Sequence, residues 1–289
     1  MRKQKPSRTA LKIAMAIVTL SAKPRMAAVI PAGAVEATEK LLVASGAVSE
    51  RIVRWARTRR MASFYDAFDW MLPGMFASLG QRKAFCERQV RDGIAAGATQ
   101  VLVLGAGYDT LGWRLAPEFP GVRFHEIDHP ATARLKRRGI EALGRRPNLV
   151  LAAEDLGERQ LSEVLAELPG WDSSVAAVFV AEGLVMYLPP QAVPELFRQC
   201  AAGSGPGSRI AFTYIPTGAD GRPDVGPWSG LMLWLQGAVG EPWTFSIRPQ
   251  ELGPFLAAAG WRDASATAFG AGKRGVEYYA AAVLHNAVD

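Results

Sequence analysis

The chain has 289 residues, of which 49% are hydrophobic, and a formal net charge of +6. This length and apolar content can bury a sizeable core, and the absence of repeats and low-complexity runs excludes repeat and largely disordered proteins. The two cysteines, Cys86 and Cys200, form neither a metal-binding spacing nor a disulfide framework. We expect a compact protein of the reducing cytoplasm, without a bound metal.

The amino-terminal third carries helical patterns. A basic start and the apolar run from Ile13 to Ala22 resemble a secretory signal, but Lys23, Pro24 and Arg25 follow where cleavage needs small residues. The run is also too short to span a membrane, so we expect a helix packed on the rest of the protein. Residues 1–97 are predicted to form a helical cap, with helices near 9–22, 33–45, 49–60 and 78–96.

Much of the positive charge is local. Such a cluster is compatible with binding to nucleic acid or to an anionic membrane. No RNA-binding pattern accompanies it, so the sequence favours a solvated helix face and no nucleic-acid partner. The cationic residues are Arg2, Lys3, Lys5, Arg8, Lys12, Arg51, Arg54, Arg57, Arg59 and Arg60.

From residue 99 onward, strand and helix patterns alternate, which is typical of a parallel sheet with helices on both faces. The predicted class is therefore α/β: a Rossmann-like core in residues 98–289 with a mostly parallel seven-stranded sheet. The glycine-rich segment 270–275 joins the last two strands, which predicts a carboxyl-terminal antiparallel hairpin. Strands are expected near 100–105, 122–127, 148–153, 175–181, 208–214, 261–269 and 276–284, and helices near 110–116, 130–143, 158–168, 190–202 and from 249.

A glycine loop follows the first predicted strand. Gly105 permits a tight backbone turn, and Gly107 lets a ligand approach the main chain. Asp128 ends the next strand, about 20 residues after Gly107, where a carboxylate accepts hydrogen bonds from ribose hydroxyls. Asp155 follows the third strand and is placed to accept a hydrogen bond from an adenine amino group. These strand ends predict a site for an adenosine-containing cofactor.

The loop favours S-adenosylmethionine over a dinucleotide. A dinucleotide fingerprint has a third glycine where this chain has Thr110. The neighbouring Asp109 would repel a pyrophosphate, whereas it is compatible with a sulfonium and an α-ammonium group.

Several motifs in the same order resemble the leucine carboxyl methyltransferase family. The resemblance spans residues 60 to 285 and implies a class I S-adenosylmethionine-dependent methyltransferase, in which an antiparallel hairpin closes the sheet and amino-terminal helices cap the cofactor pocket. The motifs are Gln81-Arg82-Lys83, Leu104 to Leu111 with Trp113-Arg114-Leu115, Glu126 to Pro130, Glu154-Asp155-Leu156 and Ala181 to Leu188.

The resemblance also implies roles for individual residues. Arg82 would hold the methionine carboxylate of the cofactor, and Glu182 would stand at its methionine end. Asp128 would bind the ribose, with Asp155 and Leu156 at the adenine. The expected cofactor-binding residues are Arg82, Gly105, Ala106, Gly107, Asp109, Asp128, His129, Glu154, Asp155, Leu156 and Glu182.

The acceptor is predicted from the scarcity of histidine. A neutral alcohol usually needs a general base, most often histidine. His125 lies inside a strand pattern, His129 is at the ribose end and His285 is near the carboxyl terminus. A carboxylate is already ionised at neutral pH. We therefore expect O-methylation of a carboxylate or acidic hydroxyl.

An aromatic-rich insertion at about 215–248 is expected to act as a lid over the acceptor. Its tryptophans either wall an apolar pocket or belong to the buried stripe of a lid helix. Candidate catalytic residues are Glu182, Tyr187 and Tyr214, and candidate pocket residues are Trp228, Trp234 and Trp243.

The predicted function is methylation of a small molecule. A role in natural-product metabolism is expected by analogy with bacterial members of the family. Segment 213–250 shows no pattern for binding a peptide carboxyl terminus, which disfavours a protein carboxyl methyltransferase. A non-catalytic S-adenosylmethionine-binding module and an NAD-dependent oxidoreductase are the alternatives from other classes.

Overall fold

The structure, a computed structural model, describes residues 6–69, 74–269 and 276–285. Within these ranges, no helix combines the length and hydropathy needed to cross a membrane. The predicted hairpin loop at 270–275 lies outside the described residues.

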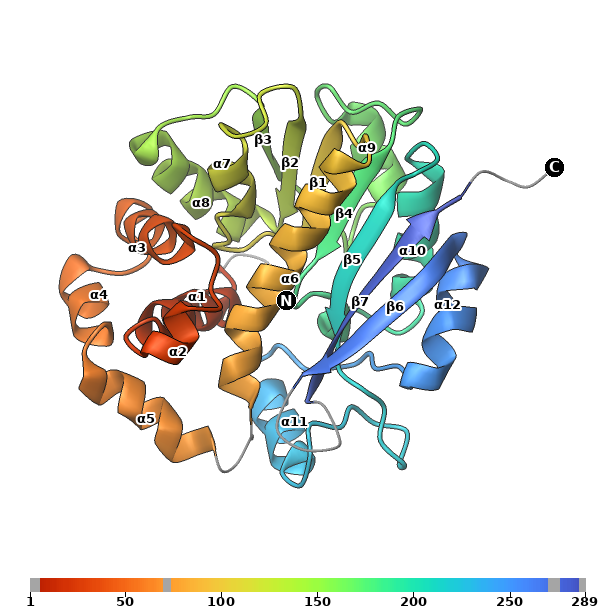
Figure 1. Cartoon of the computed structure of the whole chain (residues 1–289). Coiled ribbons are helices and arrows are strands. Elements are labelled where there is room, and N and C mark those ends of the chain that lie inside the picture. Colours follow the sequence, from red (N-terminus) through yellow and green to blue (C-terminus); the bar gives the residue numbers. More distant parts are fainter. Residues whose placement is uncertain (1–5, 70–73, 270–275, 286–289) are drawn as a thin grey trace.

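The core is one seven-stranded sheet with the order β3-β2-β1-β4-β5-β7-β6 (Figure 1). Strands β1 to β5 are mutually parallel, and β7 is inserted antiparallel between β5 and β6. The predicted mostly parallel sheet and its closing hairpin are therefore confirmed. The strands are β1 (Gln100–Leu104), β2 (Arg123–Asp128), β3 (Leu149–Ala153), β4 (Ala177–Ala181), β5 (Arg209–Tyr214), β6 (Trp261–Phe269) and β7 (Glu277–Leu284).

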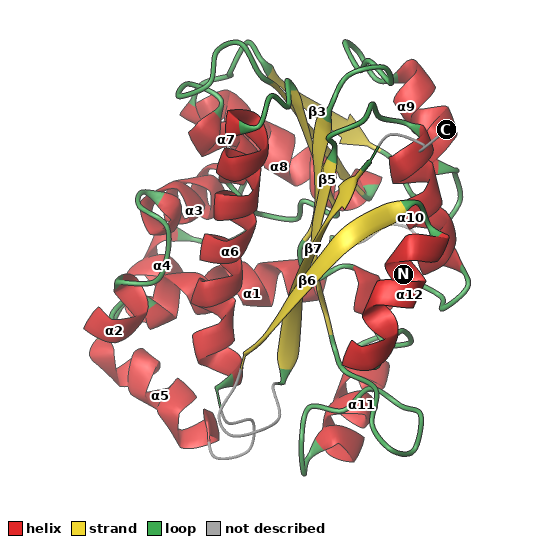
Figure 2. Ribbon diagram, turned by 45° about the vertical axis from the view of Figure 1, so that its right-hand side comes forward, coloured by secondary structure: helices red, strands yellow, loops and turns green. Residues whose placement is uncertain are grey.

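Helices cover both faces of the sheet (Figure 2). Phe85, Cys86 and Val90 of α6 pack with Leu111 of α7 and the β1 side chain Val101. The opposite face is covered by α9, α10 and α12, which share a second apolar cluster with β4 and β5. The bounds of these helices, and of α8 between β2 and β3, are α6 (Met75–Ala95), α7 (Leu111–Leu115), α8 (Pro130–Leu143), α9 (Leu161–Glu167), α10 (Ala192–Ala202) and α12 (Leu252–Ala258).

The chain order creates a switch point between β1 and β4. The chain moves outward from β1 to β3 and then crosses back to β4. Ligands of open α/β sheets bind beyond the carboxyl ends of the strands at such a point. The loops after β1 and β4 therefore define where a functional site is expected.

The amino-terminal helices pack against this edge. Ala14 and Val18 of α1 are buried together with Leu41 of α3, Tyr108 of the glycine loop and Ile140 of α8. The expectation that the first apolar run is a packed helix is thereby confirmed. The helices are α1 (Arg8–Leu20), α2 (Pro24–Ala27), α3 (Ala34–Ala44), α4 (Glu50–Ala56) and α5 (Arg59–Asp69).

One predicted helix is wrong in its extent. The range 49–60 is divided into α4 and the start of α5. Thr58 ends the first segment by donating its hydroxyl hydrogen to the Trp55 carbonyl, and its oxygen accepts from the Met61 amide of the next segment. Such local side-chain bonds compete with a continuous helix.

Candidate active site

The glycine loop and Asp128 lie side by side at the carboxyl edge of the sheet. β1 and β2 are neighbours that pair Leu104 with Ile127, so the loops that follow them meet. Gly105 and Gly107 have φ angles of 63° and 50°, in the left-handed region that favours glycine. The Gly107 amide donates to Asp128 Oδ2 at 2.5 Å. Two features that were predicted from separate motifs thus form one unit.

Asp109 has a structural role in this loop. Its Oδ1 accepts hydrogen bonds from the Thr110 and Leu111 amides at 2.6 and 3.1 Å, which begins α7. Its Oδ2 lies 3.0 Å from Lys83 Nζ. Burial alone would raise the pKa of Asp109, but the surrounding cations, Lys83 foremost, lower it to about 2. These contacts account for Asp109 without a ligand.

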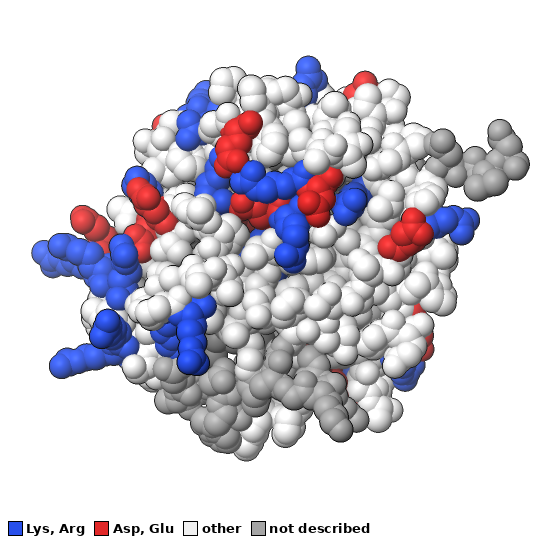
Figure 3. Space-filling view, in the orientation of Figure 1, with Lys and Arg blue, Asp and Glu red and all other residues white. Residues whose placement is uncertain are grey.

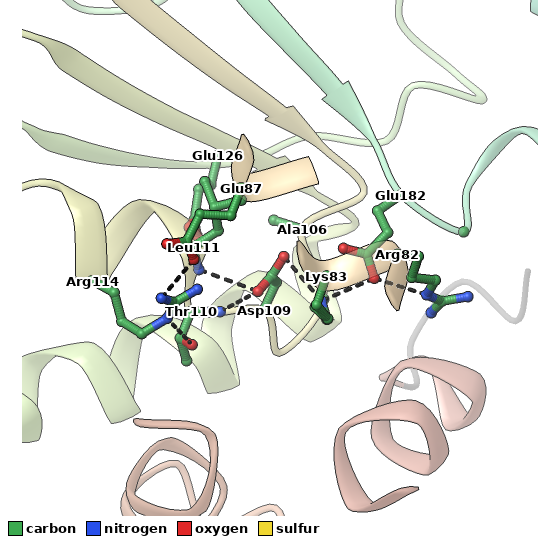
Figure 4. A network of polar contacts seen from close by, with 12 residues as sticks. Arg82, Lys83, Glu87, Ala106, Asp109, Thr110, Leu111, Arg114, Glu126 and Glu182 are labelled. Carbon is green, nitrogen blue, oxygen red and sulfur yellow. Dashed lines mark hydrogen bonds and ion pairs between the residues drawn. The ribbon is translucent and has the colours of Figure 1, made fainter. Parts of the chain in front are cut away.

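Buried charges gather where α6 meets β4 (Figure 4). Arg82 Nε donates to Glu182 Oε1 at 2.9 Å, and Lys83 Nζ lies 3.0 Å from the same oxygen. The Glu182 side chain is only 5% exposed. Its Oε2 is also buried and accepts no hydrogen bond from any part of the chain that the structure describes. A buried carboxylate oxygen without a donor is costly, which makes it a candidate ligand contact.

Glu277 is a member of this cluster that the sequence analysis missed. It is the first residue of β7, and its carboxylate accepts from Arg82 Nη1 at 3.3 Å and from the Ser78 hydroxyl at 3.2 Å. Burial would lower the pKa of Arg82, but Glu277 and Glu182 raise it above its usual range. Both guanidinium contacts therefore go to protein carboxylates, and the role of Arg82 toward a ligand carboxylate stays a prediction.

A second buried ion pair, between Lys136 and Glu126, lies next to the glycine loop. Lys136 Nζ of α8 lies 2.5 Å from Glu126 Oε2 of β2, and both side chains are 2% exposed. Lys136 also donates to the Ala106 carbonyl at 3.4 Å. Nothing in the sequence around Lys136 indicates that this lysine is buried. The charge of Glu126 inside an apolar strand, in contrast, indicates that a buried cationic partner exists.

The expected adenine edge is assembled at the ends of β2 and β3. His129 begins α8, with Nδ1 accepting from the Ala131 amide at 3.3 Å, so its Nε2 carries the hydrogen that faces Asp155 Oδ2 at 3.5 Å. Asp155 also accepts from the Gly157 amide at 2.9 Å. Glu154 is paired with Arg159 at 3.1 Å and so points to the surface. Leu156 packs on the core beside them.

The candidate catalytic tyrosines differ in their surroundings. Tyr214 is fully buried, its ring stacks on Tyr278 at 5.3 Å, and burial raises the pKa of its hydroxyl. The structure thus places Tyr214 in the core instead of at an acceptor. Tyr187 is half-buried and packs with Trp243 against Met186. Burial raises the pKa of Tyr187 as well.

The helix of the insertion, α11 (Ser229–Ala238), lies at the surface, so the buried-stripe interpretation is wrong for it. No residue of α11 is buried, and Trp234 is 66% exposed. Trp228 precedes the helix and is also exposed. Trp243, in contrast, packs against the buried cluster that includes Met186. A role of the three tryptophans in an acceptor pocket stays a prediction.

Helix α1 covers the glycine loop. A Cβ placed on Gly107 would lie 3.1 Å from Ala10 Cβ, and the loop borders a cavity of about 10 Å³, room for one water. Glu241 of the insertion holds α1 in place by accepting from the Arg8 amide at 3.2 Å and the Thr9 amide at 3.1 Å. Entry of a nucleoside-sized ligand to Gly107 requires α1 to move.

Comparison with known proteins agrees with this architecture. Residues 31–201 match the family model described as leucine carboxyl methyltransferase. A protein of Mycolicibacterium paratuberculosis, provisionally named an S-adenosyl-L-methionine-dependent methyltransferase, is 34% identical over 175 residues, which are 60% of this chain and 55% of that protein. A provisionally named methyltransferase of Mycobacterium tuberculosis is 36% identical over 137 residues, covering 47% of this chain and 39% of that protein. The chain spans about half the length of the curated relatives it matches.

The fold also has a solved counterpart. The crystal structure of a provisionally assigned methyltransferase from Thermobifida fusca superimposes with a TM-score of 0.61 at 18% identity, covering 86% of this chain and 94% of that one. The fold is therefore the Rossmann-like fold of class I methyltransferases. The chain belongs to the leucine carboxyl methyltransferase family.

Proposed function

We propose that this protein is an S-adenosylmethionine-dependent O-methyltransferase that acts on a carboxylate or acidic hydroxyl of a small molecule. The observation that carries the proposal is the buried, unpartnered Oε2 of Glu182 at the same sheet edge as the glycine loop and Asp128. Family membership and the names of the relatives support the coarser activity, methyl transfer from S-adenosylmethionine.

The residues of this edge fit the proposed cofactor. Glu182 Oε2 offers an acceptor for the α-ammonium group, and Asp128 offers its carboxylate to ribose hydroxyls. Asp155, steadied by His129, would receive the adenine amino group. The bound cofactor supplies a methyl group on sulfonium sulfur, which is already a good electrophile.

The contribution of the chain is binding and orientation. Holding two reactants in line contributes up to about 7–11 kcal/mol to lowering a barrier. Lys83 Nζ lies 3.0 Å from both Glu182 and Asp109 and so links Glu182 to the glycine loop. Helix α1 lies over Gly107 and so limits access of solvent to this part of the loop. An acceptor oxygen that is already ionised would take the methyl group without losing a proton to the protein, while the carbon–sulfur bond of the cofactor would break and its thioether product would leave.

A reaction without a histidine base predicts a specific mutational result. His125 is buried with Nε2 3.1 Å from the Pro169 carbonyl, and His285 pairs with Asp263 on the surface. Replacing His125, His129 and His285 one at a time with asparagine is expected to retain turnover within about a hundredfold. A larger loss in steady-state rate, with cofactor binding intact, would contradict the absence of a histidine base.

The proposed activity is tested by two titrations and one assay. Calorimetry is expected to show binding of S-adenosylmethionine and none of NAD, whereas the opposite result would make the chain an oxidoreductase. Transfer of labelled methyl groups to a panel of small carboxylic acids and phenols, with carboxyl-terminal peptides alongside, then identifies the acceptor class. Labelling of peptides alone would favour a protein carboxyl methyltransferase, and binding without any transfer a non-catalytic module.

The contact of Glu241 with α1 predicts a kinetic effect. A hydrogen bond to a charged group contributes about 1.5–3 kcal/mol, and Glu241→Gln weakens the three that tether α1, from the Ser7 hydroxyl and from the Arg8 and Thr9 amides. We expect stopped-flow association of S-adenosylmethionine to become at least about threefold faster. Glu251→Gln, which removes only a surface pair with Arg248, is the matched control. An unchanged rate in Glu241→Gln would show that α1 does not limit entry.

A further inference from the structure

Helices α4 and α5 present large apolar side chains to solvent. Ile52 is 49% exposed, Trp55 is 59% exposed and Phe64 is 56% exposed. Ile52 and Trp55 are three residues apart in α4 and so lie on the same face of the helix. Exposed apolar groups that gather on one surface mark an interaction site.

Arginines surround these side chains. Arg51 and Arg54 alternate with Ile52 and Trp55 along α4, and Arg59 and Arg60 begin α5. None of these four arginines has a carboxylate within 4.0 Å among the ion pairs of the described residues, whereas Arg57 pairs with Glu39 at 3.2 Å. Figure 3 shows the blue side chains at the left edge of the molecule, where Figure 1 places α3, α4 and α5.

Buried residues on the opposite face of α4 keep Ile52 and Trp55 pointing toward solvent. Val53 and Ala56 are buried in the cluster formed with α1 and α3, so the helix cannot roll to hide Ile52 and Trp55. The exposed groups are therefore a stable outer surface of the folded protein. The sequence favoured a plain solvated face because no RNA-binding pattern accompanies the arginines. The packing of Val53 and Ala56 shows in addition that the apolar groups point outward.

We propose that the surface formed by Arg51, Ile52, Arg54, Trp55, Arg59 and Arg60 binds the face of an anionic lipid bilayer. Aromatic and aliphatic side chains enter the boundary between headgroups and acyl chains, while neighbouring arginines meet the anionic headgroups. Nucleic acid would use the arginines and stack on Trp55, but it has no use for the aliphatic Ile52. This inference goes beyond the proposed methyl transfer and does not depend on it.

Vesicle sedimentation tests the proposal with the full chain. We expect it to pellet with vesicles of 70% phosphatidylcholine and 30% phosphatidylserine, and to stay in the supernatant with pure phosphatidylcholine. Either Trp55→Ala or the double change Arg51→Gln and Arg54→Gln should lower the partition coefficient about tenfold or more, with an unchanged melting temperature.

Trp234→Ala is the matched control, since Trp234 is exposed to a similar degree on α11, a helix without basic residues. Its partition should equal that of the unaltered protein. The proposal is overturned by absence of binding to the anionic vesicles, by an equal loss in Trp234→Ala, or by binding that Trp55→Ala leaves intact. Retention of the protein by a single-stranded RNA, lost in the arginine variant, with no vesicle binding, would assign the surface to nucleic acid instead.

Discussion

Replacing Lys136 with methionine is expected to lower the free energy of unfolding by about 3–5 kcal/mol, because it leaves a buried carboxylate without its cation. The pair joins α8 to β2 at 2.5 Å, and both side chains are almost completely inaccessible. Chemical denaturation monitored by circular dichroism measures the change. The double variant Lys136→Met with Glu126→Leu removes both charges, and it should recover most of the loss.

The Lys136 variant also has an expected pH dependence. Burial raises the pKa of Glu126 above its usual range even beside Lys136. A group whose folded-state pKa is raised contributes stability at low pH, and the contribution is lost as the pH rises through the folded-state value. The deficit of Lys136→Met should therefore be smaller near about pH 5 than near about pH 8. An equal deficit at both values would mean that Glu126 is not the group left unpaired.

Asp128→Ala is expected to weaken binding of S-adenosylmethionine by about 1–3 kcal/mol through lost charge-assisted hydrogen bonds. The carboxylate lies beside the glycine loop and already accepts the Gly107 amide. Calorimetric titration gives the affinity directly. Asp128→Asn, which keeps an oxygen for the Gly107 amide and removes the charge, separates loss of the anion from loss of loop geometry.

Asp172, at the amino ends of the strands, offers a matched control for the Asp128 variant. Asp172 precedes β4 and accepts the Ser174 amide at 2.8 Å. Asp172→Ala removes an aspartate with a similar turn-forming contact, and its affinity for S-adenosylmethionine should equal that of the unaltered protein. Unchanged affinity in Asp128→Ala would remove Asp128 from the proposed cofactor site.

The sheet could be predicted because its signals are local. Val101 to Leu104 is an apolar run followed by Gly105, and such a run is typical of a buried parallel strand with its turn. The same reasoning located Asp128 and Asp155 at neighbouring strand ends. The alternation of strands and helices predicted a mostly parallel sheet, whereas the strand order is known only from the structure.

The parts that escaped prediction depend on contacts between distant segments. Glu277 contacts Arg82 from nearly two hundred residues further along the chain. The sequence around either residue does not indicate that the two form a pair. Trp234 belongs to an apolar stretch that reads as buried, but α11 lies outside the core and leaves it exposed. The break between α4 and α5 depends on a single hydroxyl, that of Thr58.

The structure gives Asp109 contacts that its place in the glycine-loop motif did not indicate. Its position in the glycine loop predicted a contact with a cofactor. Its two oxygens also begin α7 and contact Lys83, which in turn contacts Glu182. The direct contact of Asp109 with a cofactor stays a prediction, and loss of Asp109 should also loosen Glu182.

The most direct measurement is a crystal structure of the protein with S-adenosylmethionine or its demethylated product. We expect the methionine ammonium group within hydrogen-bond distance of Glu182, the ribose on Asp128 and the adenine beside Asp155, with α1 displaced from or repacked over Gly107. A nucleoside bound elsewhere, or contacts at this edge that leave Glu182 and Asp128 unused, would contradict the proposed site.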